Sequence, residues 1–192
     1  MASKPGERKL QILQTVAEML EQPKGEKITT AALAARLDIS EAALYRHFAS
    51  KAQMFEGLIE FIEQTVFSLI NKISADESNG LQQIESTLAM LLGFAQKNRG
   101  MTRVLIGDAL VNEDARLQQR INQLYDRLEA SLKQSIRIAV TQGALDDKTD
   151  VSAYANLLLC YVIGRWQQFG KSGFGRDPMA QWPQQLAMLL KK

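Results

Sequence analysis

Apolar side chains recur along most of the chain at intervals of three and four residues, the spacing of one face of an α-helix. Leu10, Leu13 and Ala17, for example, mark one face of a helix expected over residues 7–21, which a break at Pro23-Lys24-Gly25 follows. No run of alternating apolar and polar residues argues for a strand. The pattern therefore predicts an all-α protein of about nine helices, over residues 7–21, 30–37, 41–48, 51–74, 81–97, 101–111, 114–142, 150–170 and 179–190.

Two short helices follow the first one closely. Thr29 and Thr30 offer N-caps for the helix over residues 30–37, and Ser40 caps the helix over residues 41–48. Two short helices joined by a tight turn at Asp38-Ile39 make a helix-turn-helix. We expect its small core to consist of Leu33, Ala34, Leu37, Ile39 and Leu44. The chain then divides into a DNA-binding domain over residues 1–50 and a helical domain over residues 51–192.

The second of these short helices is the predicted reading helix, because its first turns carry small side chains that fit the major groove and polar groups that reach phosphates. We expect Thr30 and Lys51 to contact phosphates, since both lie at helix starts. Ala42 and Ala43 are expected to approach base edges or the sugar wall, and Tyr45 suits either that role or a phosphate contact. The predicted DNA-binding residues are Thr29, Thr30, Ser40, Ala42, Ala43, Tyr45, His47 and Lys51.

The net charge of +2 is unevenly distributed. Residues 1–51 contain eight Lys or Arg and six Asp or Glu, whereas the other 141 residues contain fifteen of each sign. The excess includes a thin N-terminal arm of Lys4, Arg8 and Lys9. Taken alone this is a weak indication of DNA binding, but it falls on the same part of the chain as the helix-turn-helix.

The residues that enzymes use most often are scarce. The chain has one histidine, His47, at the DNA-facing end of the reading helix, and one cysteine, Cys160. A histidine-dependent catalytic triad and a zinc site of the His/Cys type are therefore excluded, and we expect neither an enzyme nor a bound metal or cofactor. A single cysteine agrees with a reducing compartment. Because residues 1–9 lack an apolar stretch of the signal-peptide type, a cytoplasmic location is expected.

The last two expected helices are rich in apolar residues, and residues 150–170 are apolar on several faces. They suit the core of a single chain, or a two-fold four-helix bundle with a second copy. For the dimer we assign Tyr154, Leu158, Tyr161, Val162, Trp166, Trp182 and Leu186. A pocket for a small ligand, lined by Tyr154, Trp166, Phe169 and Met188, is the less favoured alternative, and it would suit a ligand-responsive repressor.

The segment from Thr29 through Tyr45 to Lys51 resembles the signature of the TetR family of bacterial regulators. The segments over residues 40–48, 58–63, 91–94, 120–124 and 127–130 are similar to the nucleoid occlusion factors of that family. The resemblance covers roughly residues 7–190. Two positions depart from the family pattern, with Asp38 where Gly is common and Ala49 where Pro is usual. A non-glycine residue in such a turn costs up to ~1 kcal/mol, and Asp is among the better-tolerated types.

The resemblance implies a nucleoid-associated homodimer that binds palindromic chromosomal DNA, with the number of dimers per site left open. On DNA such factors engage the C-terminal tail of the tubulin-like division protein FtsZ and block Z-ring assembly and septum formation over the nucleoid. The resemblance also implies that the tail lies in a groove of the fourth and fifth helices, at positions that match Phe61, Gly93 and Asn98, with conservative replacements at Met90 and Lys97. An apolar groove with a cationic rim suits an acidic, apolar peptide.

Overall fold

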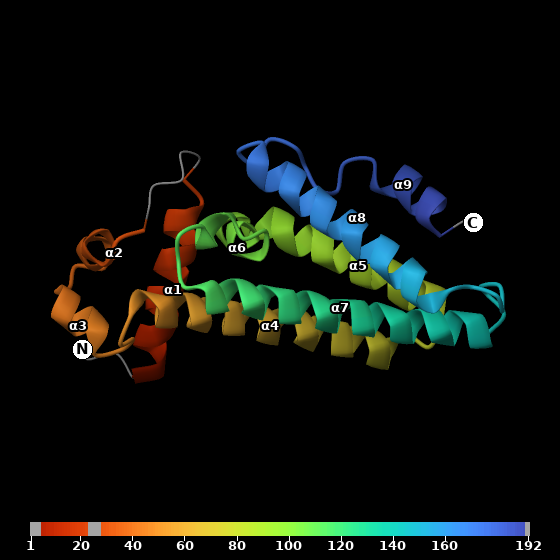
Figure 1. Ribbon diagram of the computed structural model, residues 1–192, viewed down its shortest axis with the longest axis horizontal. Coiled ribbons are helices and arrows are strands. Elements are labelled where there is room, and N and C mark those ends of the chain that lie inside the picture. Colours follow the sequence, from red (N-terminus) through yellow and green to blue (C-terminus); the bar gives the residue numbers. More distant parts are fainter. Residues whose placement is uncertain (1–4, 23–27, 191–192) are drawn as a thin grey trace. The chain divides into compact units, whose positions relative to one another are not determined.

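The computed structural model describes residues 5–22 and 28–190, and every regular element in these ranges is helical. The first four are α1 (Pro5–Leu20), α2 (Thr30–Arg36), α3 (Glu41–Tyr45) and α4 (Lys51–Asp76). The others are α5 (Gly80–Lys97), α6 (Arg99–Leu105), the 3-10 helix η1 (Asp108–Leu110), α7 (Ala115–Thr141), α8 (Val151–Lys171) and α9 (Trp182–Leu189) (Figure 1). The all-α prediction of about nine helices is confirmed. Lys4 and the predicted break at residues 23–25 lie outside the described residues. None of the described helices combines the length and apolar character needed to span a bilayer.

The first compact unit comprises residues 1–62 and 98–121. Within it α1 packs against α6 and also contacts α2. α1 and α6 lie close together at Gly100, where a Cβ atom would lie 1.9 Å from the carbonyl oxygen of Ala17. Because α6 packs on α1, this unit extends beyond residues 1–50, which the sequence assigned to the DNA-binding domain.

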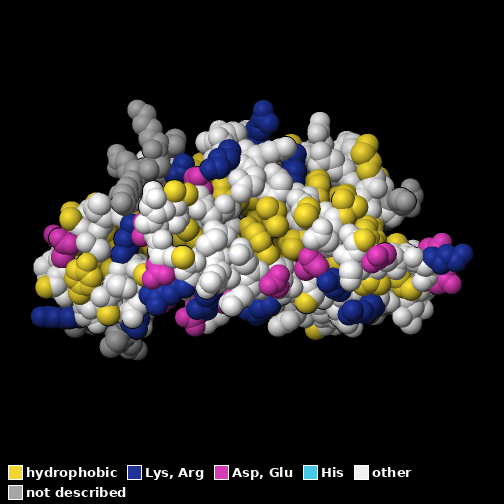
Figure 2. All heavy atoms as spheres, in the orientation of Figure 1, with side chains coloured by type: hydrophobic (Ala, Val, Ile, Leu, Met, Phe, Trp, Pro, Cys, Tyr) yellow, Lys and Arg dark blue, Asp and Glu magenta, His cyan; other side chains and the backbone are white. Residues whose placement is uncertain are grey.

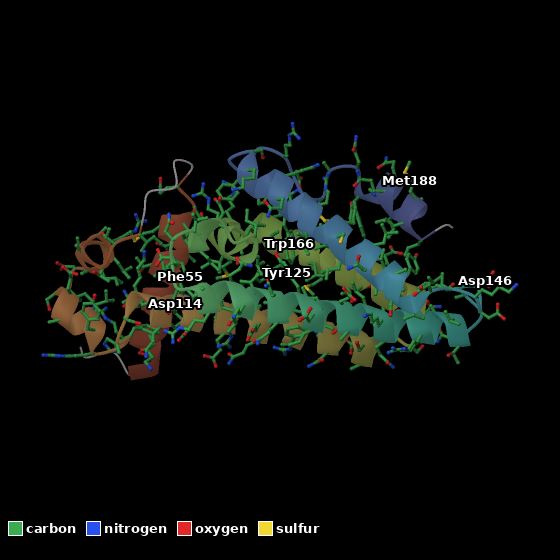
Figure 3. The ribbon with its side chains drawn as sticks, viewed as in Figure 1. Phe55, Asp114, Tyr125, Asp146, Trp166 and Met188 are labelled. Atoms are coloured by element: carbon green, nitrogen blue, oxygen red, sulfur yellow. The ribbon has the colours of Figure 1, made fainter. Side chains whose placement is uncertain are left out.

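The second compact unit comprises residues 63–97 and 122–192, and α5 packs against α8 within it. Trp166 on α8 lies in its core, 1% exposed, and the indole Nε1–H donates to the carbonyl oxygen of Leu91 on α5 at 3.0 Å. The ring of Tyr125 on α7 lies 6.4 Å from that of Trp166 between the centroids (Figure 3). Three helices of this unit therefore meet at one buried indole.

One predicted helix is two elements in the structure. The expected helix over residues 101–111 begins earlier and ends at Leu105, and η1 follows it. Gly107 between them has φ 77°, in the left-handed region that glycine adopts without a steric penalty. The apolar residues continue through the break, so the periodicity did not reveal it.

Candidate nucleic-acid interface

Side-chain caps fix the starts of the two short helices. Thr29 precedes α2, and its Oγ1 accepts a hydrogen bond from the backbone N–H of Ala32 at 3.1 Å. Ser40 precedes α3, and its Oγ accepts one from the N–H of Ala43 at 3.2 Å. Both caps were predicted from the sequence and are confirmed. They satisfy donors that a helix start otherwise leaves without a partner.

The turn between α2 and α3 has a strained residue at its centre. Asp38 has φ 52°, which lies in the left-handed region. Glycine is the common residue at this position in the TetR signature. Asp tolerates this conformation better than most side chains. The turn allows α2 and α3 to pack on each other through four buried residues, Leu33, Ala34, Leu37 and Leu44. Ile39, the fifth predicted core residue, is only half-buried.

The outward side of α3 carries the residues predicted to face DNA. Ala42 and Tyr45 are exposed, Tyr45 to 45%, whereas Ala43 and His47 are half-buried. Leu44, between them in sequence, is fully buried and anchors the helix. Ala42 is thus the small exposed residue of α3, between the larger Glu41 and Tyr45, and it allows close approach to a groove.

Four of the predicted DNA-binding residues meet at one hollow of about 360 Å³ in the first unit. It lies where the starts of α2 and α4 and the end of α3 come together, and we call it the Thr30–Lys51 hollow. Its lining residues are Ile28, Thr29, Thr30, Tyr45, Lys51, Asn112 and Glu113. Two hydroxyl-bearing threonines, a phenol and an ammonium group around one hollow form a suitable surface for a phosphate.

Two of these polar groups bind carboxylates of the chain itself. Lys51 Nζ lies 2.5 Å from Glu113 Oε1, and the Thr30 hydroxyl donates to Glu41 Oε2 at 2.6 Å. The Lys51 and Glu113 side chains are only 22% and 13% exposed. Sequence reasoning missed Glu113, because it lies 62 residues from Lys51 and no local spacing connects the two.

The residues assigned to a partner peptide are distributed over both units. Phe61 and Asn98 belong to the first unit and are half-buried. Met90, Gly93 and Lys97 belong to the second unit, and their spacing of three and four places them on one face of α5. Asn98 precedes α6 and the other four lie on α4 or α5. The contact of these residues with a peptide stays a prediction.

The second unit has a cavity of about 370 Å³ between α4 and α5. Met90 is the one residue of the predicted set that lines it; the full lining is Leu69, Lys72, Ile73, Asp76, Glu77, Ser86 and Met90. Leu69 is 39% exposed although it is apolar. The α4 residues in this wall were not among the predicted site residues. The exposed apolar side chain of Leu69 is the feature that indicates a surface there.

The residues assigned to dimerisation lie mainly inside the single chain. Four of them, Leu158, Val162, Trp166 and Leu186, are at most 8% exposed and belong to the core of the second unit. The Tyr154 and Tyr161 hydroxyls donate to the Leu189 carbonyl oxygen at 2.7 Å and to Gln185 Oε1 at 2.5 Å, and so hold α9 onto α8. The half-buried ring of Trp182 lies 6.4 Å from that of Tyr161. The four core residues are therefore not available as exposed contacts.

The apolar surface on this part of the second unit comes from other residues. Leu157 on α8 is 55% exposed and Met188 on α9 is 77% exposed, and Figure 2 shows hydrophobic side chains over these two helices. Figure 3 shows Met188 pointing away from the helices. Met188 and Tyr154 line a hollow of about 660 Å³ at the ends of α8 and α9, while Trp166 and Phe169 are core residues. The four residues considered for a ligand pocket thus do not share one cavity.

The fold and the helix-turn-helix define an all-α DNA-binding protein. Residues 12–58 match the family described as bacterial regulatory proteins, tetR family, and residues 78–192 match the tetracyclin repressor-like C-terminal domain. The nucleoid occlusion factor SlmA of Marinomonas sp. is 48% identical over 189 residues, 98% of this chain and 96% of that protein. SlmA of Alteromonas mediterranea is 50% identical over 186 residues, 97% and 95% of the two chains. The chain belongs to the TetR family, and within it to the SlmA nucleoid occlusion factors.

Solved structures agree on the fold. A TetR transcription regulator from Haloarcula marismortui superposes with a TM-score of 0.82 at 14% identity, covering 97% of each chain. The regulator AibR, solved with isovaleryl coenzyme A and operator DNA, superposes with a TM-score of 0.74 at 17% identity, covering 95% of this chain and 98% of AibR. At this level of identity the likeness concerns the fold alone.

Proposed function

We propose that this protein is a nucleoid occlusion factor that binds palindromic chromosomal DNA as a homodimer and, once bound, engages the C-terminal tail of FtsZ to block Z-ring assembly over the nucleoid. Its membership of the SlmA nucleoid occlusion factors supports both the DNA binding and the role in cell division. The observation that supports the partner site within this chain is the cavity between α4 and α5, because its walls at Leu69, Ile73 and Met90 are apolar; its charged residues are Lys72, Asp76 and Glu77.

For the DNA interface, we infer that the Thr30–Lys51 hollow faces the phosphate backbone. Thr30 and Lys51 donate to phosphate oxygens there, and Tyr45 on its rim supplies a phenol. Ala42, exposed on α3, approaches base edges or the sugar wall, where its small side chain allows close contact. An alanine-rich reading helix senses groove shape and thymine methyl groups more than a pattern of donors and acceptors.

Replacing Lys51 with alanine is expected to weaken DNA binding to specific and nonspecific duplexes alike, since a phosphate contact carries no sequence information. The slope of log K against log salt concentration should flatten by ~0.9, the value for one lost phosphate contact. Fluorescence anisotropy titrations at several salt concentrations measure both quantities. Lys133→Ala is the matched control, because Lys133 pairs with Glu129 at 2.7 Å in the second unit and is 26% exposed. An unchanged slope in Lys51→Ala would remove Lys51 from the interface.

For the partner site, we infer that an extended or helical peptide with apolar and acidic side chains lies against α5. Its apolar side chains enter the cavity beside Leu69 and Met90. Its carboxylates meet Lys97 at the C-terminal end of α5. A cation at a helix C-terminus also interacts favourably with the helix dipole. Phe61, Gly93 and Asn98 complete the proposed contact set, as the family resemblance implies.

Replacing Met90 with aspartate is expected to weaken binding of an FtsZ tail peptide more than about tenfold, a change of about 1.4 kcal/mol. The new carboxylate removes apolar wall and repels an acidic peptide. Isothermal titration of the DNA-bound protein measures this affinity, and Met179→Asp places the same change at a half-buried methionine before α9, outside the proposed peptide and dimer contacts, as a control. DNA binding should stay intact in both variants.

The same titration on the unmodified protein separates the division role from the alternative of a ligand-responsive repressor. No heat from the DNA-bound protein with the tail peptide would contradict the division role and leave the repressor. Phe61→Ala and Asn98→Ala should retain DNA binding and lose the ability to block division when overproduced. If both variants still block division, the peptide lies elsewhere.

For the homodimer, we infer that the second copy covers the exposed apolar side of α8 and α9. Ala153, Leu157, Cys160 and Gly164 on α8 follow one another at intervals of four, three and four residues and share one face of the helix. Leu157 supplies bulk on this face, and the small residues beside it allow a second helix to come close. Met188 adds exposed apolar surface on α9.

A further inference from the structure

Glu113 comes to the Thr30–Lys51 hollow from a part of the chain outside the helix-turn-helix. It lies in the loop between η1 and α7, and its backbone N–H donates to the carbonyl oxygen of Leu110 at 3.0 Å. The preceding Asn112 has φ 65°, a left-handed conformation that asparagine tolerates. The loop is thus shaped so that the Glu113 carboxylate reaches Lys51 Nζ at 2.5 Å.

Carboxylates and phosphates both present anionic oxygens that accept hydrogen bonds from an ammonium group. In the hollow, Glu113 already occupies this position against Lys51. We propose that Glu113 competes with a DNA phosphate for Lys51 and thereby limits the affinity of the protein for DNA. This inference rests on the proposed phosphate contact of Lys51, and it assigns to Glu113 a role in setting the affinity for DNA.

The surroundings of the pair make this competition substantial. Lys51 and Glu113 are 22% and 13% exposed, so water screens their attraction less than it screens a surface pair. The Phe55 ring lies 5.7 Å from Lys51 Nζ and limits where the ammonium can move. The Lys51 ammonium has three N–H donors, but a phosphate that shares it with Glu113 weakens their pairing. The Glu113 carboxylate also remains close to the incoming negative charge. Both effects oppose DNA binding.

Replacing Glu113 with glutamine removes the charge while keeping the size of the side chain and an amide oxygen that can still accept from Lys51. DNA affinity is expected to rise about threefold to tenfold, and the salt slope to steepen by much less than ~0.9, because Lys51 already makes most of one phosphate contact when Glu113 is charged. Asp114→Asn is the control, since it makes the same charge change at the next residue, where the carboxylate pairs with Arg116 Nε at 3.0 Å. A similar gain in both variants would show a general charge effect and overturn the competition.

The double variant Lys51→Ala, Glu113→Gln identifies the group through which Glu113 acts. Competition for Lys51 predicts that the gain from Glu113→Gln is smaller when Lys51 is absent, because only the direct repulsion between the carboxylate and DNA then remains. An undiminished gain overturns the proposal. Failure of Lys51→Ala to weaken binding would instead refute the phosphate contact on which the proposal rests. Glu113→Asp provides an independent readout, because it keeps the charge but withdraws it by one methylene and should give a smaller gain. Urea unfolding curves confirm that each variant is folded under the binding conditions.

Discussion

Replacing Gly100 with alanine is expected to lower the free energy of unfolding by about 3 kcal/mol, at the upper end of what overpacking a buried site costs. A Cβ atom at this position would lie 1.9 Å from the carbonyl oxygen of Ala17, where real Cβ contacts under 3.0 Å essentially do not occur. The clash is with backbone, so no side-chain rotation relieves it, and α1 and α6 must separate. Alanine gains about 1 kcal/mol over glycine inside a helix, which offsets only part of the cost.

Gly93→Ala is the matched control for this prediction. Gly93 also lies within a helix, α5, but a Cβ atom added there would meet no atom within 4 Å beyond the adjoining backbone of its own helix. Its replacement should leave stability unchanged or raise it by up to about 1 kcal/mol. Urea or guanidinium unfolding, followed by far-UV circular dichroism, measures both free energies. Equal values for the two variants would mean that α1 and α6 do not approach each other so closely at Gly100.

The separation of α1 and α6 in Gly100→Ala should also affect the DNA interface. α1 contacts α2, and Arg36 on α2 lies 3.6 Å from Glu18 on α1. A displaced α1 therefore disturbs the support of the helix-turn-helix. We expect Gly100→Ala to weaken DNA binding even at temperatures where the protein remains folded, whereas Gly93→Ala should leave the DNA affinity unchanged.

The helix-turn-helix was predictable from the sequence because local interactions determine it. Thr29 and Ser40 cap helices that begin one residue later, and Asp38 adopts the positive φ that the tight turn requires. Each of these features involves residues within a few positions of one another. The arrangement of the hollow was not predictable in the same way, since Glu113 reaches Lys51 from 62 residues away.

The C-terminal helices show a different limit. Their apolar composition predicted correctly that they are buried, but it could not distinguish burial within one chain from burial against a second copy. Trp166 and Val162 turned out to be core residues of the single chain, and Leu157 is the exposed one. A helix that is apolar on several faces can pack within its own chain on one face and against a second copy on another. The three-dimensional structure is needed to tell which face is buried within the chain.

Trp166 itself provides the second large expected effect. Its replacement by alanine should lower the free energy of unfolding by about 4 kcal/mol, the typical cost of removing a buried indole together with the cavity that remains. The indole is 1% exposed and contacts the ring of Tyr125 on α7 as well as α5. Burial of that phenol raises the pKa of Tyr125 to about 12, which agrees with a densely packed apolar environment at this point.

Two further variants separate the contributions to this effect. Trp166→Phe keeps an aromatic ring but loses the hydrogen bond from Nε1–H to the Leu91 carbonyl oxygen, and should cost about 1–2 kcal/mol. Trp182→Ala removes the same side chain from a half-buried position, and should cost clearly less than Trp166→Ala. Denaturant titrations give all three free energies. Because Leu91 follows Met90 and lies two residues before Gly93 on α5, the indole also fixes the part of α5 proposed to bind the FtsZ tail. A cost for Trp166→Ala no larger than for Trp182→Ala would contradict its place at the centre of this core.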